Sequence, residues 1–266
     1  MIYYYSGTGN TRRAAQFIAC ETGDGLHFIP ASGEVPVPAE GESMGFMFPI
    51  YSWGVPPVVT SFLDRLPRDT MQDRYIWAVC TCGDEAGIAM RLFSRHIRKL
   101  RGRGADALFS VIMPNDYVLL PGFDVDFPEV AAAKLKAAPQ RLMSIARLVN
   151  SHAKGVNDVH EGSMPALRTR IVFPLFRRWG INPGRWRVDA ACIGCGKCAA
   201  SCPSGNISLT RGRPVWGKNC LSCCACFHSC PERAISYGSF TRGKGQYLCP
   251  DPLRHDVKSD EHSDKR

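Results

Sequence analysis

The chain has 266 residues, of which 45% are apolar and 21% charged, enough for two modest domains with hydrophobic cores. No apolar run could span a bilayer, and the strand-like start MIYYY is unlike a secretion signal, so a cytoplasmic protein is expected. The net charge of +9 comes from the second half: residues 1–150 carry 15 basic and 15 acidic residues, and residues 151–266 carry 18 and 9. This excess favours an acidic partner.

The first 150 residues alternate apolar runs with segments of helical periodicity. Strands are predicted at residues 1–5, 44–51, 74–80 and 107–114, and helices at 11–21, 56–66, 86–101 and 128–150. Because strands alternate with helices, we expect an α/β domain whose parallel sheet is covered on both faces.

Three further segments follow this domain. Residues 151–187 are predicted to be a connector, residues 188–248 a cysteine-rich domain and residues 249–266 a polar tail. The connector mixes apolar residues and arginines around Pro165 and Pro174. We favour a connector packed between the two domains; the alternative is a short helix lying on a membrane surface.

The cysteine-rich domain contains an internal duplication. The segments CIGCGKCAASCPSGNISL and CLSCCACFHSCPERAISY align at an offset of 28 residues, and both read C-x2-C-x2-C-x3-C-P. In a chain without a leader, such short fixed spacings indicate metal binding rather than disulfides. Three thiolates at i, i+3 and i+6 can cap three corners of a cubane cluster, whereas the fourth ligand must come from another direction.

This domain closely resembles the bacterial two-cluster ferredoxins, which implies two [4Fe–4S] clusters. In that family the fourth cysteine of each run binds the other cluster. The resemblance implies that one cluster binds Cys192, Cys195, Cys198 and Cys230, and the other Cys202, Cys220, Cys223 and Cys226. A pair of zinc sites is the alternative, because C-x2-C pairs also bind zinc. Cys224 aligns with Gly196 and is expected to be the extra cysteine.

The segment SGTGNT, residues 6–11, follows the first predicted strand and begins a helix. Its glycines let a ligand approach the backbone, and the helix N-terminus favours an anion. Together with the hydroxyls of Ser6, Thr8 and Thr11, this predicts a phosphate-binding loop. It is not a dinucleotide fingerprint, because Arg12 replaces the third glycine, and it lacks the Gly-Lys-Ser/Thr of a P-loop. An ordinary strand–helix turn is the alternative.

The loops PIYSWG and TCG, after the next two buried strands, should lie beside this glycine loop at the carboxyl edge of the sheet. Residues 1–150 thereby resemble the flavodoxin family, which implies a doubly wound, five-stranded parallel sheet that binds FMN. The implied FMN-binding residues are Ser6, Gly7, Thr8, Gly9, Asn10 and Thr11 around the phosphate, and Pro49, Ile50, Tyr51, Ser52, Trp53, Gly54, Thr81, Cys82 and Gly83 beside the isoalloxazine ring.

Several residues keep two interpretations. Trp53, Tyr51 and Tyr117 are candidates to stack on the flavin ring, with ordinary packing as the alternative. Cys80 and Cys82 should point the same way from one strand, and we favour packing for Cys80 over a redox pair. His228 lies between predicted cluster ligands, and a solvated helix position is favoured over tuning of a cluster's potential.

The two halves together resemble a bacterial and archaeal family that fuses a flavodoxin-like domain to a small α+β two-cluster ferredoxin. The resemblance implies an electron-transfer protein that passes electrons between two [4Fe–4S] clusters and FMN, and to a redox partner protein, for which an acidic carrier would fit. The alternative is an FMN-dependent reductase of a small-molecule substrate. No motif identifies a catalytic residue, and neither a nucleic-acid partner nor a membrane span is expected.

Overall fold

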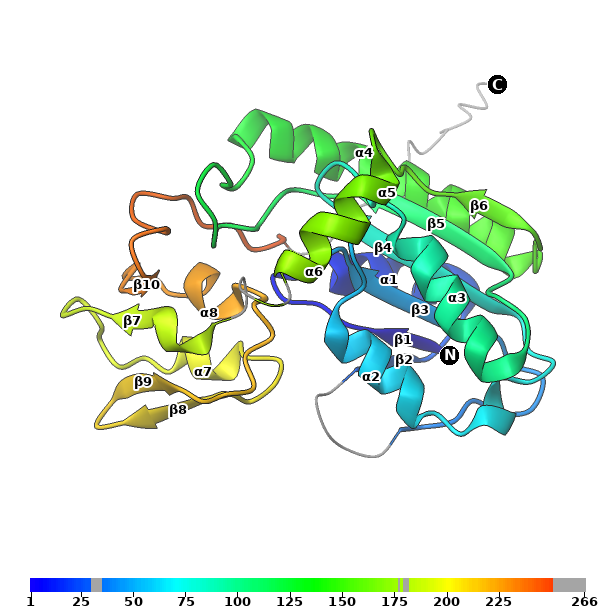
Figure 1. The fold of residues 1–266 in the computed structure, drawn as a ribbon, viewed down its shortest axis with the longest axis horizontal. Coiled ribbons are helices and arrows are strands. Elements are labelled where there is room, and N and C mark those ends of the chain that lie inside the picture. The colour runs from blue at the N-terminus through cyan, green and yellow to red at the C-terminus, as the bar shows by residue number, and fades with distance from the viewer. Residues whose placement is uncertain (30–34, 177, 179–181, 251–266) are drawn as a thin grey trace, which may run out of the picture.

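A computed structural model describes residues 1–29, 35–176, 178 and 182–250 (Figure 1). Its main feature is a parallel sheet with the strand order β2-β1-β3-β4-β5-β6. The strands are β1 (Ile2–Tyr4), β2 (Leu26–Phe28), β3 (Met44–Pro49), β4 (Ile76–Cys82), β5 (Ala107–Ile112) and β6 (Val156–Asp158). The order of the first five is that of flavodoxin-like doubly wound folds, as predicted. The part of the predicted tail from residue 251 onward lies outside the described residues.

The sheet has six strands, so the prediction of five strands was wrong. The additional strand β6 lies in the segment predicted as a connector, and it pairs in parallel with β5 from Ala107↔Val156 to Phe109↔Asp158. With three residues, two of them exposed, β6 has no apolar run to mark it. Its pairing partner is distant in sequence, and this pairing is what makes the segment a strand.

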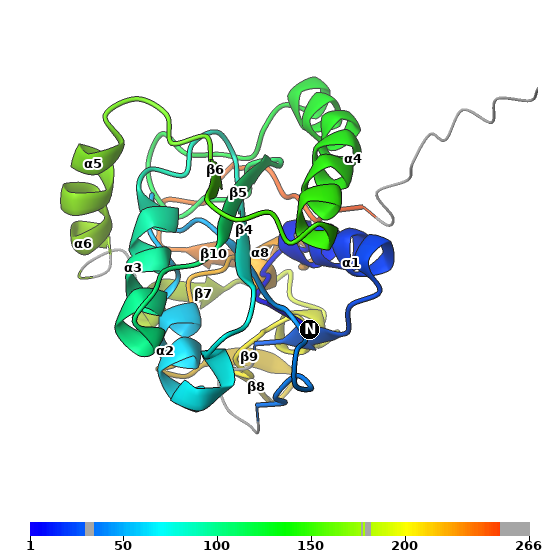
Figure 2. The ribbon, with the colours of Figure 1, turned by 90° about the vertical axis from the view of Figure 1, so that its right-hand side faces the viewer.

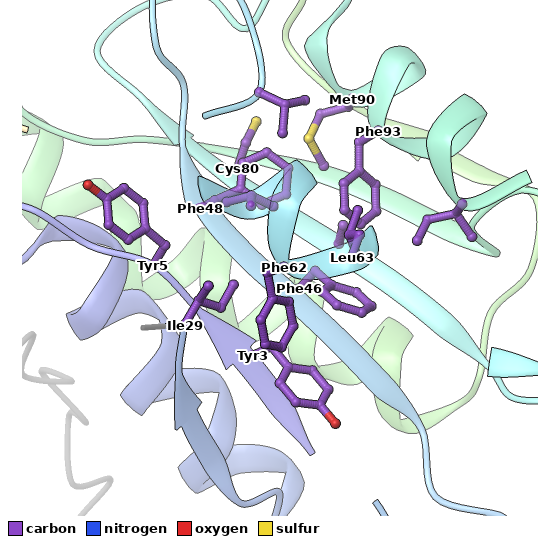
Figure 3. Packing of buried hydrophobic residues seen from close by; sticks show 14 of the residues in the cluster. Tyr3, Tyr5, Ile29, Phe46, Phe48, Phe62, Leu63, Cys80, Met90 and Phe93 are labelled. Atoms are coloured by element: carbon purple, nitrogen blue, oxygen red, sulfur yellow. The ribbon is translucent and has the colours of Figure 1, made fainter. Parts of the chain in front are cut away.

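Helices cover both faces of the sheet, and Figure 2 shows the two layers from the side. The helices α1 (Asn10–Thr22) and α4 (Pro128–Asn150) pack on one face, and α2 (Pro57–Arg65) and α3 (Ala89–Arg101) pack on the other. On the second face Tyr3, Phe46, Phe62 and Phe93 are fully buried; Phe46 packs on Phe93 and Tyr3, and Tyr3 also packs on Phe62 (Figure 3). The nearly continuous apolar runs of β3 and β4 are explained by this burial on both sides.

A short helical rod leads out of this domain. It consists of α5 (Pro165–Leu167), a wider turn at Arg168–Val172 and α6 (Phe173–Leu175). Thr169 fixes the rod to the α/β domain: its hydroxyl donates to the carbonyl of Trp53 at 2.7 Å and accepts from the Ile88 N–H at 3.0 Å. We call residues 165–176 the connector helix. No helix among the described residues is long and apolar enough to cross a membrane.

The cysteine-rich region is built from short elements that repeat. They are β7 (Trp186–Val188), α7 (Lys197–Ala200), β8 (Ile207–Thr210), β9 (Arg213–Trp216), α8 (Ala225–His228) and β10 (Ile235–Tyr237). The strands form two antiparallel pairs, β7 with β10 and β8 with β9. Helices α7 and α8 begin 28 residues apart, and the equivalent Ser201 and Ser229 hydroxyls meet at 2.9 Å. The sequence duplication is therefore also a structural one.

Candidate functional site

A cavity of about 530 Å³ lies at the carboxyl edge of the parallel sheet, within the range of roughly 300–1,000 Å³ typical of cofactor sites. The loops after β1, β3, β4 and β5 all contribute to its wall. Of the fifteen residues that the flavodoxin resemblance implies, thirteen line this cavity, and Gly9 and Gly54 do not. The fold thus brings together loops that are far apart in the chain.

The glycine loop is already organised by contacts within the protein. Gly9 precedes α1 with φ of 108°, a conformation that favours glycine. The side chain of Asn10 is held at both ends, because its amide donates to the carbonyl of Pro114 at 2.9 Å and its oxygen accepts from the Tyr247 hydroxyl at 2.7 Å. Asn10 therefore fixes the loop to two other segments of the chain.

The hydrogen bonds of the Thr8 and Thr11 hydroxyls differ from the prediction that these groups donate to a phosphate. The Thr8 hydroxyl donates to the carboxylate of Asp116, and the Thr11 and Thr81 hydroxyls share a 2.7 Å hydrogen bond. Since each hydroxyl has one proton, Thr8 cannot donate to a phosphate while it donates to Asp116. The backbone N–H groups at the start of α1, which a helix leaves without internal partners, are the donors best suited to an anion.

Three aromatic residues proposed for flavin stacking line the cavity: Tyr51, Trp53 and Tyr117. The Tyr51 hydroxyl lies 3.1 Å from that of Tyr5, and the guanidinium of Arg168 lies 5.1 Å from the Trp53 ring centroid. Tyr117 differs from both, because its buried hydroxyl has no hydrogen-bond partner among the described residues. A buried polar atom without a partner is expected to receive one from a ligand or water.

Cys80 and Cys82 pack into the same core cluster from β4. Burial, and then a hydrogen bond to Cys82, raise the pKa of the Cys80 thiol well above its usual value. Cys82 also lines the cavity.

The four cysteines predicted to share the first cluster surround one hollow, although one of them comes from the second sequence run. Cys192, Cys195, Cys198 and Cys230 all line this space. Burial raises the pKa of Cys198, and the nearby Cys230 and Cys192 raise it further. Cys195 is exposed, so this group of thiols reaches the protein surface.

The second predicted set also converges. Burial raises the pKa of Cys226, and Cys223, Cys220 and Cys202 raise it further because they lie nearby. The backbone N–H of Asn206 donates to the Cys202 sulfur at 3.3 Å, an interaction that favours a thiolate. Among the described residues, no group of three His, Cys, Asp or Glu side chains is arranged to hold a single metal ion.

Residues 183–235 match a protein family described as "4Fe-4S dicluster domain". No curated protein matches the sequence. The chain joins a flavodoxin-like domain to a 4Fe–4S dicluster domain. The strand order defines the first domain, and the family match defines the second.

Several solved structures resemble the chain weakly. One is described as a flavoprotein from Bacteroides uniformis; it is 17% identical over 42% of this chain and 90% of that chain, with a TM-score of 0.36. A second, from Bacteroides eggerthii, is 17% identical over 35% and 77%, with a TM-score of 0.29. The third is the rubredoxin:oxygen oxidoreductase of Desulfovibrio gigas, which is 14% identical over 57% and 36%, with a TM-score of 0.34. Similarities at this level carry no argument about function.

The dicluster domain forms part of the wall of the flavodoxin-like cavity, a feature that sequence reasoning missed. Ser222, Cys223 and Cys224 line the cavity together with the glycine loop. A Cβ atom at Gly7 would lie 2.8 Å from the carbonyl oxygen of Cys223 and 2.9 Å from its Cβ, too close for a side chain. Gly7 therefore has a second role: it lets the dicluster domain reach the cavity.

His228 and Cys249 connect the two domains, although the sequence predicted no such contact for either residue. His228 is buried rather than solvated, so that expectation was wrong. Its Nδ1 accepts from the Tyr247 N–H at 3.1 Å, so a neutral ring donates from Nε2 to the Asp116 carbonyl at 2.7 Å. Cys249, predicted to begin the tail, is buried, and its N–H donates to the Thr8 carbonyl at 3.0 Å. Neither contact could be found without the tertiary structure.

Proposed function

We propose that this protein carries electrons between two [4Fe–4S] clusters and an FMN, and exchanges them with a redox partner protein. The observation that carries the proposal is the position of Cys223. This predicted cluster ligand lines the same cavity as the residues that resemble a flavodoxin's FMN site, and it packs directly on Gly7. A cluster bound at Cys223 would thus be separated from a bound flavin by little more than its own ligand.

The residues of the cavity fit a flavin nucleotide in size and in chemistry. The start of α1 offers N–H donors for a phosphate, and aromatic and apolar side chains line the rest of the wall. When bound, [4Fe–4S] clusters transfer single electrons and FMN holds one or two. The chain's own contribution is to hold the two sites side by side.

The two predicted cluster sites have different surroundings, and this difference indicates a route for electrons between the protein surface and the flavin. The set containing Cys223 adjoins the cavity, whereas the set containing the exposed Cys195 reaches the surface, where Ile193 is 65% exposed. We propose that the partner docks beside Cys195 and that the second cluster relays electrons between this surface and the flavin.

The proposal is tested by anaerobic purification, by quantification of iron, sulfide and flavin, and by rapid-mixing reduction with a low-potential one-electron donor. About eight irons and one FMN per chain are expected. In the variant Cys223→Ser, reduction of the flavin through the clusters should slow at least tenfold while FMN still binds. If no flavin co-purifies and none binds when added, the proposal fails.

The neighbouring cysteine provides a matched control. Cys224 is also buried and also lines the cavity, but it is predicted to bind no cluster. Cys224→Ala should therefore retain about eight irons and the rapid reduction of the flavin. A loss of four irons in this variant would show that Cys224 is a ligand and that the predicted ligand set is wrong.

The unpartnered hydroxyl of Tyr117 favours a second candidate function, an FMN-dependent reductase. Tyr117 lines the cavity with Phe123 and Phe176, which meet its ring edge-on at centroid distances of 5.8 Å. A small substrate bound over the flavin would find a hydrogen-bond donor there. Multiple turnovers with an added small molecule, lost in Tyr117→Phe with electron transfer intact, would favour this function over that of a carrier.

A further inference from the structure

We infer that the outer face of the connector helix docks on an anionic membrane surface. The helix presents a stripe of exposed aliphatic side chains at helical spacing. Leu167 is 50% exposed, Ile171 51% and Leu175 45%, and Met164, which directly precedes the helix, is 64% exposed. Exposed apolar side chains that are grouped on one element, rather than scattered singly over the surface, mark an interaction surface.

The opposite face of the helix already packs on the protein, so the helix cannot rotate to bury this stripe. Thr169 is buried and hydrogen-bonded to the backbone of Trp53 and Ile88, and Phe176 is buried against Tyr117. Figure 2 shows the rod of α5 and α6 at the edge of the molecule, beyond α3. The stripe is thus a fixed outer surface of the fold.

Charge distinguishes a lipid surface from other occupants. Between residues 164 and 187 the sequence has no aspartate or glutamate, and it has arginines at positions 168, 170, 177, 178, 185 and 187. Arg170 is exposed beside the stripe, next to Ile171. Glu85 and Glu161, which come from outside the segment, form ion pairs with Arg168 and Arg91, so Arg168 is already paired and Arg170 is the arginine placed to contact a lipid headgroup.

The combination is that of an interfacial helix. Aliphatic side chains enter the boundary between headgroups and acyl chains, while Arg170 contacts anionic headgroups. An acidic protein partner would use the arginines but would leave the four aliphatic side chains without a role. The inference does not depend on the proposed function, because it uses neither the clusters nor the flavin.

The test is co-sedimentation of the cofactor-loaded protein with vesicles of phosphatidylcholine alone or with about one third phosphatidylglycerol. Binding to the anionic vesicles should be at least ~10-fold tighter and should weaken as salt is raised. The triple variant Leu167→Gln/Ile171→Gln/Leu175→Gln should lose at least ~10-fold in affinity, and Arg170→Gln should lose about fivefold.

The matched control changes exposed aliphatic residues elsewhere. Val130, on α4, and Val215, on β9, are 43% and 49% exposed. Val130→Gln/Val215→Gln should bind vesicles like the unchanged protein. The inference is overturned if the protein binds neither vesicle, if the stripe variant binds as tightly as the control, or if sedimentation velocity shows that the stripe instead forms a dimer that the triple variant abolishes.

Discussion

The two domains have different kinds of core. The flavodoxin-like domain has an apolar cluster on each face of its sheet, with Phe46, Phe62, Trp77 and Phe109 fully buried. The dicluster domain has strands and helices of three or four residues, and its one cluster of buried residues includes Cys198 and Cys226. In the core of the dicluster domain, predicted metal ligands therefore take the place that aromatic and aliphatic side chains have in the core of the flavodoxin-like domain.

This difference indicates that only one domain should fold without its cofactor. A core of aromatic and aliphatic side chains needs no ligand, whereas a small metal-binding domain gains much of its folding free energy from the metal. The predictions below probe this contrast, beginning with the largest effect.

Removal of iron should unfold most of the dicluster domain and leave the flavodoxin-like sheet intact. After anaerobic treatment with a chelator, amide hydrogen exchange should lose protection in β8 and β9 and keep it in β3 and β4. Val118 and Leu119 should also lose protection, because they pack into the core of the dicluster domain. Unchanged protection in β8 and β9 would show that this domain folds without clusters.

The fold and the site could be predicted from the sequence only where a local pattern of residues records them. The cysteine ligands are recognisable because their spacing is local, and β3, β4 and β5 because burial on both faces requires continuous apolar runs. The short strands β2 and β6 carry no such signal, since pairing with distant strands creates them. The contributions of Asp116, Phe176 and Cys224 to the cavity arise from contacts between segments distant in sequence, which no local pattern records.

Asp106→Asn should destabilise the flavodoxin-like domain by about 3 kcal/mol, because it leaves the charge of a buried guanidinium without a carboxylate to balance it. Arg101 is fully buried and lies 2.9 Å from the Asp106 carboxylate. Burial raises the pKa of Asp106, but the Ile76 N–H and Arg101 outweigh it, so the pKa lies below its usual value. Urea unfolding followed by circular dichroism would measure the loss.

The pH dependence of Asp106 has a definite sign. A depressed folded-state pKa stabilises the protein above the unfolded-state pKa of about 4, and this stability is lost as the pH falls through the folded-state pKa. Asp106→Asn should remove that part of the acid dependence. The control is Asp158→Asn, whose ion pair with Arg141 is half exposed and should contribute at most about 1 kcal/mol. Equal losses in both variants would contradict the prediction.

Asp116→Asn should strengthen FMN binding about tenfold at high pH, where Asp116 is ionised, because it removes a negative charge beside the glycine loop. Burial raises the pKa of Asp116, while the hydrogen bond from the Thr8 hydroxyl partly opposes the shift. In the unchanged protein, FMN affinity should therefore fall as rising pH ionises this carboxyl group. Fluorescence titration with riboflavin, which lacks the phosphate, is the control, and an equal pH effect on both ligands would show that Asp116 does not act on the phosphate.

The smallest effect concerns the two copies within the dicluster domain. Gly205 and Arg233 are equivalent in the repeat, and both have left-handed backbones, with φ of 58° and 51°. The left-handed conformation costs a residue with a side chain about 1–2 kcal/mol, whereas the greater freedom of glycine in the unfolded chain costs about 0.5–1 kcal/mol.

Because Arg233 is exposed, Arg233→Gly should stabilise the domain by about 0.5–1 kcal/mol. The reverse change, Gly205→Arg, should destabilise it by a similar amount, since a Cβ there meets no atom within 4 Å and only the backbone conformation opposes it. Thermal unfolding of the cluster-loaded protein would measure both, and a loss of stability in Arg233→Gly would show that this side chain contributes contacts that outweigh its backbone strain.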